Sequence, residues 1–263
     1  MKKSYIIPAL LLLIIFVSIA NAGVAKDLAA VHNENKQVLK PKVGSDQLIP
    51  VLMYHSIAYE KGNELRVPVE KFEAQMKYLK ENNFKTLTLD QLYEYLNGNE
   101  PIPCKSVVLT FDDGYEDNYV NAFPVLKKYG FKASVFVITT TVDKNEKCLN
   151  SSQLKEMQNN GIDIESHTAD HLELDKPPYN RQFAQLNKSK LYLESILNKK
   201  IYYLAYPVGK WNNDTILAAK NAGYKMAFTT KNSRAGKSNG LFTLNRVRIN
   251  ASCSMEQFKK LVE

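Results

Sequence analysis

Two short segments of the sequence combine residue types that could bind a metal ion and activate water. Residues 167–171, HTADH, place two imidazoles four positions apart, a spacing that suits joint ligation of one metal from a helical turn or a tight loop. Asp112 and Asp113 are adjacent, and one carboxylate with two histidines gives the three-ligand site with an open position that catalytic metals need. The sequence therefore predicts a metal site made by His167, His171 and one of the two aspartates.

The surroundings of these segments favour a metal site over plainer interpretations. Two histidines at this spacing are more often surface residues, and an Asp-Asp-Gly run is good turn chemistry. Here the aspartates directly follow the apolar run at 107–111, and His167 directly follows the run at 162–166. In parallel α/β folds the carboxyl ends of the strands share one face, which carries the active site. One aspartate can then bind the metal while its neighbour acts as a general base.

Short β-branched and aromatic runs alternate with amphipathic stretches over most of the chain, which is typical of strands alternating with helices in a parallel sheet or barrel. Gly130, Gly161 and Gly223 stand where helices should end, each just before a strand-like run. Ser254 with Gln257 is expected to cap a final helix. The strand-like runs are Val51–Ile57, Lys85–Leu89, Ser106–Phe111, Lys132–Ile138, Asp163–Ser166, Tyr202–Pro207, Met226–Thr230 and Phe242–Ile249.

The N-terminus has the pattern of a secretory signal peptide over residues 1–22. Two lysines precede an apolar run that ends in a small-x-small cleavage pattern at residues 20–22. The run is long for a signal but short of the roughly 18–20 residues that span a bilayer, so an uncleaved membrane anchor is the alternative. We expect a linker over 23–47 and one catalytic domain over 48–263. The protein is expected to be secreted or attached to the outer face of the cell membrane.

The charged residues and the cysteines exclude some classes of function. The formal charge is +8, without any dense run of Lys or Arg, which favours a solvated basic surface or weak attraction to an anionic cell wall over a nucleic-acid site. Cys104, Cys148 and Cys253 show no CxxC spacing, and their odd number permits at most one disulfide and one free thiol. We interpret these cysteines as structural or incidental, not catalytic.

The two chemical segments together resemble a known family. TFDDG at 110–114 and HTADH at 167–171 are similar to the first two signature motifs of the polysaccharide deacetylases, carbohydrate esterase family four, which contain the NodB-homology domain. The resemblance covers roughly residues 48–250 and implies a distorted (β/α) barrel. It implies Asp112 as general base and Asp113 with both histidines of the second motif as ligands of a divalent metal. Zinc is the expected ion, and cobalt, nickel and iron suit the same ligands.

The third motif of that family is matched only in part by LAYPVG at 204–209, because Ala205 stands where the family has an arginine. The cation that would orient Asp112 must then come from elsewhere, and Arg246 is the candidate. A backbone N–H near Val208 is expected to stabilise the oxyanion, since main-chain donors do not depend on side-chain identity.

Two further residues near this motif are candidate substrate contacts. Pro207 belongs to the motif itself, and Trp211 follows it closely enough to stack on a sugar ring. A lone tryptophan beside a site serves packing about as often as it serves as a sugar platform.

A third histidine, His55, is the candidate general acid. Many family members carry this histidine near the C-terminus, but no histidine follows His171, and His32 lies in the expected linker. The segment LMYHSI at 52–57 resembles the N-terminal motif of the branch that deacetylates poly-β-1,6-N-acetylglucosamine, a biofilm exopolysaccharide, in which this histidine is the acid. The plainer interpretation of His55 is a satisfied core histidine at a strand end.

The resemblance implies an N-deacetylase that acts on an N-acetylglucosamine-containing polysaccharide at the cell surface, with poly-β-1,6-N-acetylglucosamine as the first candidate substrate. Peptidoglycan and chitin oligosaccharides are alternative substrates. A second alternative, motivated by the missing third-motif arginine, is a catalytically inactive carbohydrate-binding surface protein. We expect a monomer that binds no nucleic acid.

Overall fold

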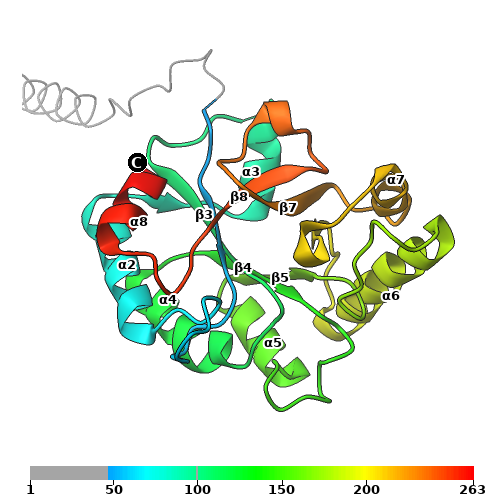
Figure 1. The fold of residues 1–263 in the computed structure, drawn as a ribbon, viewed down its shortest axis with the longest axis horizontal. Helices are drawn as coiled ribbons and strands as arrows, with labels where there is room; N and C mark the ends of the chain where they lie inside the picture. The colour runs from blue at the N-terminus through cyan, green and yellow to red at the C-terminus, as the bar shows by residue number, and fades with distance from the viewer. Residues whose placement is uncertain (1–46, 99) are drawn as a thin grey trace, which may run out of the picture. The chain divides into compact units, whose positions relative to one another are not determined.

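The computed structural model describes residues 47–98 and 100–263 (Figure 1). The predicted signal peptide or anchor and all but the last residue of the predicted linker therefore lie outside the described residues. Within the described ranges, no helix is both long enough and apolar enough to span a membrane.

Seven parallel strands form a closed barrel, which confirms the predicted distorted (β/α) barrel in a single domain. The ring runs β1-β8-β7-β6-β5-β4-β3 and closes because β1 also pairs with β3, while β2 adds to β3 outside the ring. The strands are β1 (Val51–Tyr54), β2 (Lys85–Thr86), β3 (Ser106–Phe111), β4 (Ala133–Val137), β5 (Ile162–Ser166), β6 (Tyr203–Ala205), β7 (Met226–Asn232) and β8 (Leu244–Arg248).

Each of the eight predicted strand-like runs overlaps a strand, but several expected ends were wrong. The first run stops at Tyr54, so His55 lies in a loop and not in a strand. Leu89 begins a helix, because Thr88 caps that helix by accepting a hydrogen bond from the Gln91 N–H. Pro207 begins a 3-10 turn, and its ring leaves no N–H for a strand ladder.

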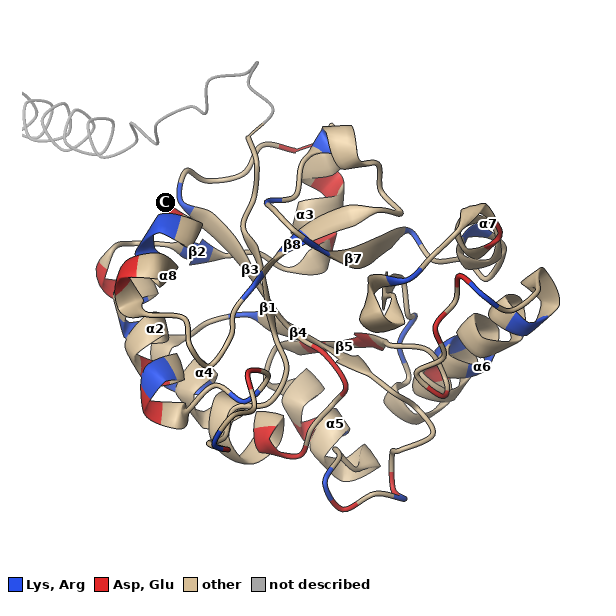
Figure 2. Ribbon diagram, viewed as in Figure 1, with Lys and Arg blue, Asp and Glu red and all other residues tan. Residues whose placement is uncertain are grey.

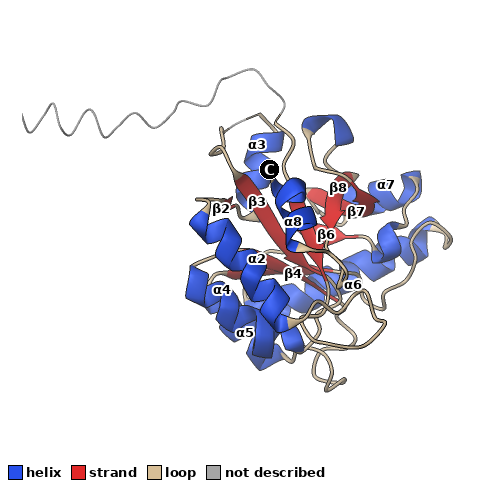
Figure 3. Ribbon diagram, turned by 60° about the vertical axis from the view of Figure 1, so that its left-hand side comes forward, coloured by secondary structure: helices blue, strands red, loops and turns tan. Residues whose placement is uncertain are grey.

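Helices surround the barrel in Figures 1 and 3, with α2, α4 and α5 side by side along one flank. Gly130 is the left-handed cap of α4, and Ser254 with Gln257 forms a capping box, as predicted. Lys and Arg are interspersed with Asp and Glu over the helices in Figure 2. The helical elements are α2 (Val69–Glu81), α3 (Leu89–Leu96), η1 (Asn118–Ala122), α4 (Phe123–Tyr129), α5 (Ser151–Asn159), α6 (Tyr179–Leu197), η2 (Pro207–Gly209), α7 (Asn213–Asn221), η3 (Lys237–Asn239) and α8 (Met255–Val262).

The side chains of β5 alternate between two environments, the apolar layer beneath the helices and the inside of the barrel. Ile162 and Ile164 pack into the apolar layer beneath the helices. Because successive side chains of a strand point to opposite faces, Asp163 and Glu165 point into the barrel, and His167 follows them at the strand end. The barrel carries a polar row from the amino end of β5 to its carboxyl end.

Candidate metal centre and active site

The two motifs and the second histidine meet at the carboxyl ends of β3 and β5. Asp113 Oδ1 lies 3.3 Å from His167 Nε2 and 3.5 Å from His171 Nε2. Ligand atoms bound at zinc distances in a tetrahedral site lie about 3.3 Å apart. All three ligand atoms lie within 4.8 Å of one another, so the residues could hold one divalent cation, and this is the trio that the resemblance implied. Three ligands leave one position of a tetrahedral site open.

The ring of His167 is held by a second contact that fixes its tautomer. His167 Nδ1 lies 2.8 Å from the carbonyl oxygen of Ala205, so Nδ1 carries the proton and donates it. Nε2 is left with its lone pair toward Asp113, the arrangement typical of metal-ligating histidines. Burial lowers the pKa of His167, but Asp113 and Asp112 raise it more, so the site attracts positive charge.

The backbone of this region is bent in ways that the motifs alone do not reveal. Asp113 (φ 73°), Thr168 (φ 67°), His171 (φ 57°) and Val208 (φ 57°) all adopt the left-handed conformation. This conformation is uncommon for residues other than glycine and costs about 1 kcal/mol or more, most for a β-branched residue such as valine. Such strain persists at functional sites, where the surrounding structure over-determines the geometry.

Asp112 forms a buried pair with Arg246, which comes from β8 across the barrel. Arg246 Nη1 donates to Asp112 Oδ1 at 2.7 Å and Nη2 donates to Oδ2 at 2.6 Å, while Nε donates to the Thr229 carbonyl at 3.0 Å. Burial raises the pKa of Asp112. The positive charges of Arg246 and His167 lower it by a larger amount, so the pKa lies well below its ordinary value. Arg246 thus supplies the cation that is missing from the third motif, where Ala205 stands in place of the family's arginine.

His55 directly follows β1 and is half-buried beside the two aspartates. Register pairs Tyr54 with Phe111, so His55 and Asp112 leave neighbouring strands at the same level. Burial lowers the pKa of His55, and the negative charges of Asp112 and Asp113 partly oppose this shift. The ring therefore shares the electrostatic environment of the metal site.

Comparison with known proteins identifies the family. Residues 99–227 match the family model for polysaccharide deacetylases. The chain is 41% identical to the putative polysaccharide deacetylase YxkH of Bacillus subtilis, over 82% of this chain and 76% of that protein. It is 32% identical to the poly-β-1,6-N-acetyl-D-glucosamine N-deacetylase of Staphylococcus aureus, over 75% of this chain and 71% of that protein.

A solved structure of a deacetylase supports the same family. The Streptococcus pyogenes deacetylase PplD in complex with acetate superposes with a TM-score of 0.80 at 34% identity, over 83% of this chain and 100% of that one. The chain belongs to the polysaccharide deacetylase family. It is therefore a hydrolase of a metal-dependent family, and its Asp-His-His trio is a group of residues that could hold a metal ion.

The deacetylase has a cavity beside its third-motif segment. Val208 and Trp211 line a cavity of about 500 Å³ together with residues of the β7–β8 region, and Trp211 is 36% exposed. Pro207 is buried and begins η2. Thr230 Oγ1 donates to the Val208 carbonyl at 3.1 Å, which holds the strained peptide in place.

Tyr115 is a further residue of the site, beside the predicted metal ligand Asp113. Its hydroxyl hydrogen-bonds to Asp113, and burial together with the Asp113 charge raises its pKa to about 12. The phenol therefore stays protonated and donates to the metal ligand. Its position two residues beyond Asp113 was the only signal in the sequence.

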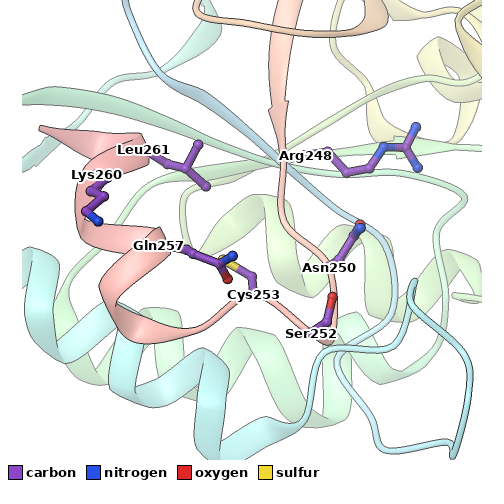
Figure 4. A pocket seen from close by; sticks show the side chains of 7 residues that line it. All are labelled: Arg248, Asn250, Ser252, Cys253, Gln257, Lys260 and Leu261. Atoms are coloured by element: carbon purple, nitrogen blue, oxygen red, sulfur yellow. The ribbon is translucent and has the colours of Figure 1, made fainter.

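A second cavity of the deacetylase, about 350 Å³, lies between the end of β8 and α8 (Figure 4). Arg248 and Cys253 are among its lining residues, and none of the expected metal ligands is.

All three cysteines are free, with Cys104 exposed and Cys253 buried, so the one disulfide that the sequence permitted is not formed.

Proposed function

We propose that this deacetylase removes N-acetyl groups from poly-β-1,6-N-acetylglucosamine outside the cell membrane. The observation that carries the proposal is the position of His55, which directly follows β1 and is level with Asp112, the residue that directly follows β3. The family alone indicates deacetylation of a polysaccharide. A histidine acid supplied from the N-terminal strand is the feature that this chain's motif shares with the β-1,6 branch, and the Staphylococcus aureus relative carries that activity in its name.

Each step of amide hydrolysis has a candidate group in the site. A divalent cation, for which we propose zinc, supplies Lewis-acid chemistry when bound by Asp113, His167 and His171: it polarises the acetyl carbonyl and makes water more acidic. Asp112, kept ionised by Arg246, accepts a proton from the attacking water. The Val208 N–H stabilises the developing negative charge on the acetyl oxygen.

His55 completes the reaction by giving its proton to the sugar nitrogen. The C–N bond breaks, acetate leaves, and the polymer keeps a free amine. An amine is a poor leaving group unless it is protonated as it departs, so this step needs a positioned acid. The lowered pKa of His55 makes its charged ring a stronger acid toward that nitrogen.

The proposed site of action follows from the N-terminal residues. The expected signal peptide or anchor over 1–22 would put the catalytic domain outside the membrane, where the polymer is found. The protein would act as a monomer, on a substrate at the cell surface or in a biofilm.

Acetate release from three substrates tests the proposal: a β-1,6-linked N-acetylglucosamine oligomer, a chitin oligomer and peptidoglycan, each with metal added back after chelation. We expect the β-1,6 oligomer to be the best substrate by kcat/KM. Preference for chitin or peptidoglycan would overturn the choice of polymer while leaving the reaction intact.

The alternative of an inactive carbohydrate-binding protein predicts no acetate from any substrate. Its motivation was the absent third-motif arginine, and the bidentate Arg246–Asp112 pair removes that motivation. His171→Ala is the matched variant, since it removes one ligand at the rim of the site. We expect at least about a 100-fold loss of kcat/KM together with weaker zinc binding.

A further inference from the structure

The loop that carries His55 is tied by hydrogen bonds to the segment that follows the first motif. Asn118 Nδ2 donates to the His55 carbonyl at 2.7 Å. The Asp117 carboxylate accepts from Ser56 Oγ at 2.5 Å and from the Ile57 N–H at 2.8 Å. The first three residues after β1 are therefore held by the side chains of Asp117 and Asn118, about sixty positions away in the chain.

Two more contacts complete this arrangement, which we call the His55 clamp (Asp117, Asn118 and Asn121). Asn118 Nδ2 also donates to Asp117 Oδ1 at 3.2 Å, and Asn121 Nδ2 donates to the Ile57 carbonyl at 2.8 Å. The two groups that Asn118 contacts, the His55 carbonyl and the Asp117 carboxylate, can only accept hydrogen bonds. The amide of Asn118 must therefore turn its Nδ2 toward them. Asn118 is 1% exposed.

The backbone that presents the clamp is unusual. Residues 118–122 form a π-helical turn, η1, in which the Phe123 N–H donates to the Asn118 carbonyl five residues earlier. Such turns are rare and occur mostly inside α-helices at functional sites. Here the turn leads from Asp112 and Asp113 into α4, so one short continuous segment joins the proposed base and a proposed metal ligand to the clamp.

We propose that Asp117 and Asn118 are positioning residues that hold His55 over the reacting nitrogen. The proposal rests on the proposed function, in which His55 is the acid. β1 ends at Tyr54, whose carbonyl accepts from the Asp112 N–H at 3.0 Å, so the ladder fixes the backbone only up to the residue before His55. Beyond that point the loop is held by the clamp together with backbone hydrogen bonds of Ser56, whose N–H donates to the Leu65 carbonyl at 3.2 Å and whose carbonyl accepts from the Val67 N–H at 3.0 Å. Of these contacts, only the clamp joins the His55 carbonyl and the Ile57 N–H to the segment after the first motif. A displacement of about 1 Å in a catalytic group can cost about 100-fold in rate.

Asp117→Ala and Asn118→Asp are the test variants. The first removes both acceptors for Ser56 and Ile57, and the second puts a carboxylate against the His55 carbonyl and Asp117. With the β-1,6 oligomer we expect each to lower kcat by about 10–100-fold, with KM and zinc affinity within about 3-fold of wild type. Asp117→Asn keeps one acceptor and should recover part of the loss.

Tyr119→Phe is the matched control. Tyr119 belongs to the same π-helical turn, but its hydroxyl donates to Glu156, away from the His55 loop. This variant removes one hydrogen bond from the turn and should keep kcat within about 2-fold of wild type. A loss as large as that of Asp117→Ala would mean that the turn matters only for folding, and would overturn the proposal.

A double-mutant cycle separates positioning from general stability. If Asp117 acts through His55, then adding Asp117→Ala to His55→Ala should cost less than about 2-fold further in kcat, whereas independent effects would multiply. An activated aryl acetate gives a second signature. Its phenolate leaves without protonation, so both single variants should hydrolyse it within about 3-fold of wild type. Multiplying losses on the oligomer, or equal losses on both substrates, would contradict the proposal.

Amide hydrogen exchange tests the clamp without any substrate. In Asp117→Ala, residues 55–57 should exchange at least about 10-fold faster than in wild type, while the segment at 167–171 keeps its rate. Unchanged exchange at 55–57 would overturn the clamp even if the enzyme is active. Wild-type protein that releases no acetate from any polymer would instead refute the proposed function, and the exchange result would still decide the clamp.

Discussion

Two acid clusters inside the barrel, one fully buried and one partly buried, reach opposite charge states. Asp112 faces one cation, Arg246, in a bidentate pair, and its pKa lies well below the ordinary value. Near the amino ends of β5 and β6, Glu165 and Asp163 share one cation, Lys199, and burial and the second carboxylate raise the pKa of Glu165 to about 8.

Burial raises the pKa of the acid in both clusters. The ratio of carboxylates to cations therefore decides whether the acid is ionised or protonated. One acid with one guanidinium stays ionised and can accept a proton during the reaction. Two acids around one lysine retain a proton between them, and Glu165 also accepts from the N–H groups of Tyr202 and Tyr203, which ties β5 to β6. The first cluster therefore suits the proposed general base, whereas the second connects neighbouring strands of the barrel.

Breaking the first cluster should have the largest effect on stability. Arg246→Ala leaves Asp112 buried without its partner, and loss of one member of a buried ion pair costs about 3–5 kcal/mol. Urea unfolding at pH 7 measures this loss, and acetate release should fall with it. Arg248→Ala, two residues further along the same strand, is the control for stability. A loss under about 1 kcal/mol for Arg246→Ala would contradict the assigned role of the pair.

Breaking the second cluster should cost less. Lys199→Met removes the shared cation, but Glu165 and Asp163 can take up protons, so we expect about 1–3 kcal/mol at pH 7 by the same urea measurement. The deacetylase kcat should stay within about 2-fold of wild type. Lys200→Met, which changes an exposed neighbour, is the control. A selective loss of kcat in Lys199→Met would mean that this cluster takes part in the chemistry.

The pH dependence of stability should separate the clusters by sign. The raised pKa of Glu165 contributes stability that is fully present below its ordinary value of 4.5 and is lost as pH rises through about 8. The lowered pKa of Asp112 contributes stability above its ordinary 3.8 and loses it only in stronger acid. Between pH 5 and 8 the free energy of unfolding should therefore decline with pH, and Glu165→Gln should flatten the decline. An equal slope in both proteins would refute this assignment.

The sequence predicted most of the site because strand ends in a parallel barrel converge. Asp113 and the HTADH histidines were placed by that rule and by the family resemblance, and the trio has the spacing of one metal site. Arg246 was a candidate only because Ala205 left a cation missing from the third motif. The structure brings its guanidinium to Asp112, 134 positions away in the chain.

Other features depend on geometry that residue types do not encode. Left-handed backbone at Val208 is imposed by the surrounding fold, since a β-branched residue rarely adopts that conformation. The clamp of Asp117 and Asn118 on His55 joins residues that no local pattern relates, through a π-helical turn. Strand ends were misplaced where Thr88 and Pro207 start helical turns.

The proposed function requires Asp113, His167 and His171 to hold the ion with which the enzyme deacetylates a β-1,6-linked polymer. The most direct measurement is acetate release from the β-1,6 oligomer by chelated protein, before and after addition of one equivalent of zinc, in wild type and Asp113→Ala. The account predicts that zinc restores the wild type and not Asp113→Ala. Activity of Asp113→Ala near that of the wild type with metal removed from both would contradict it.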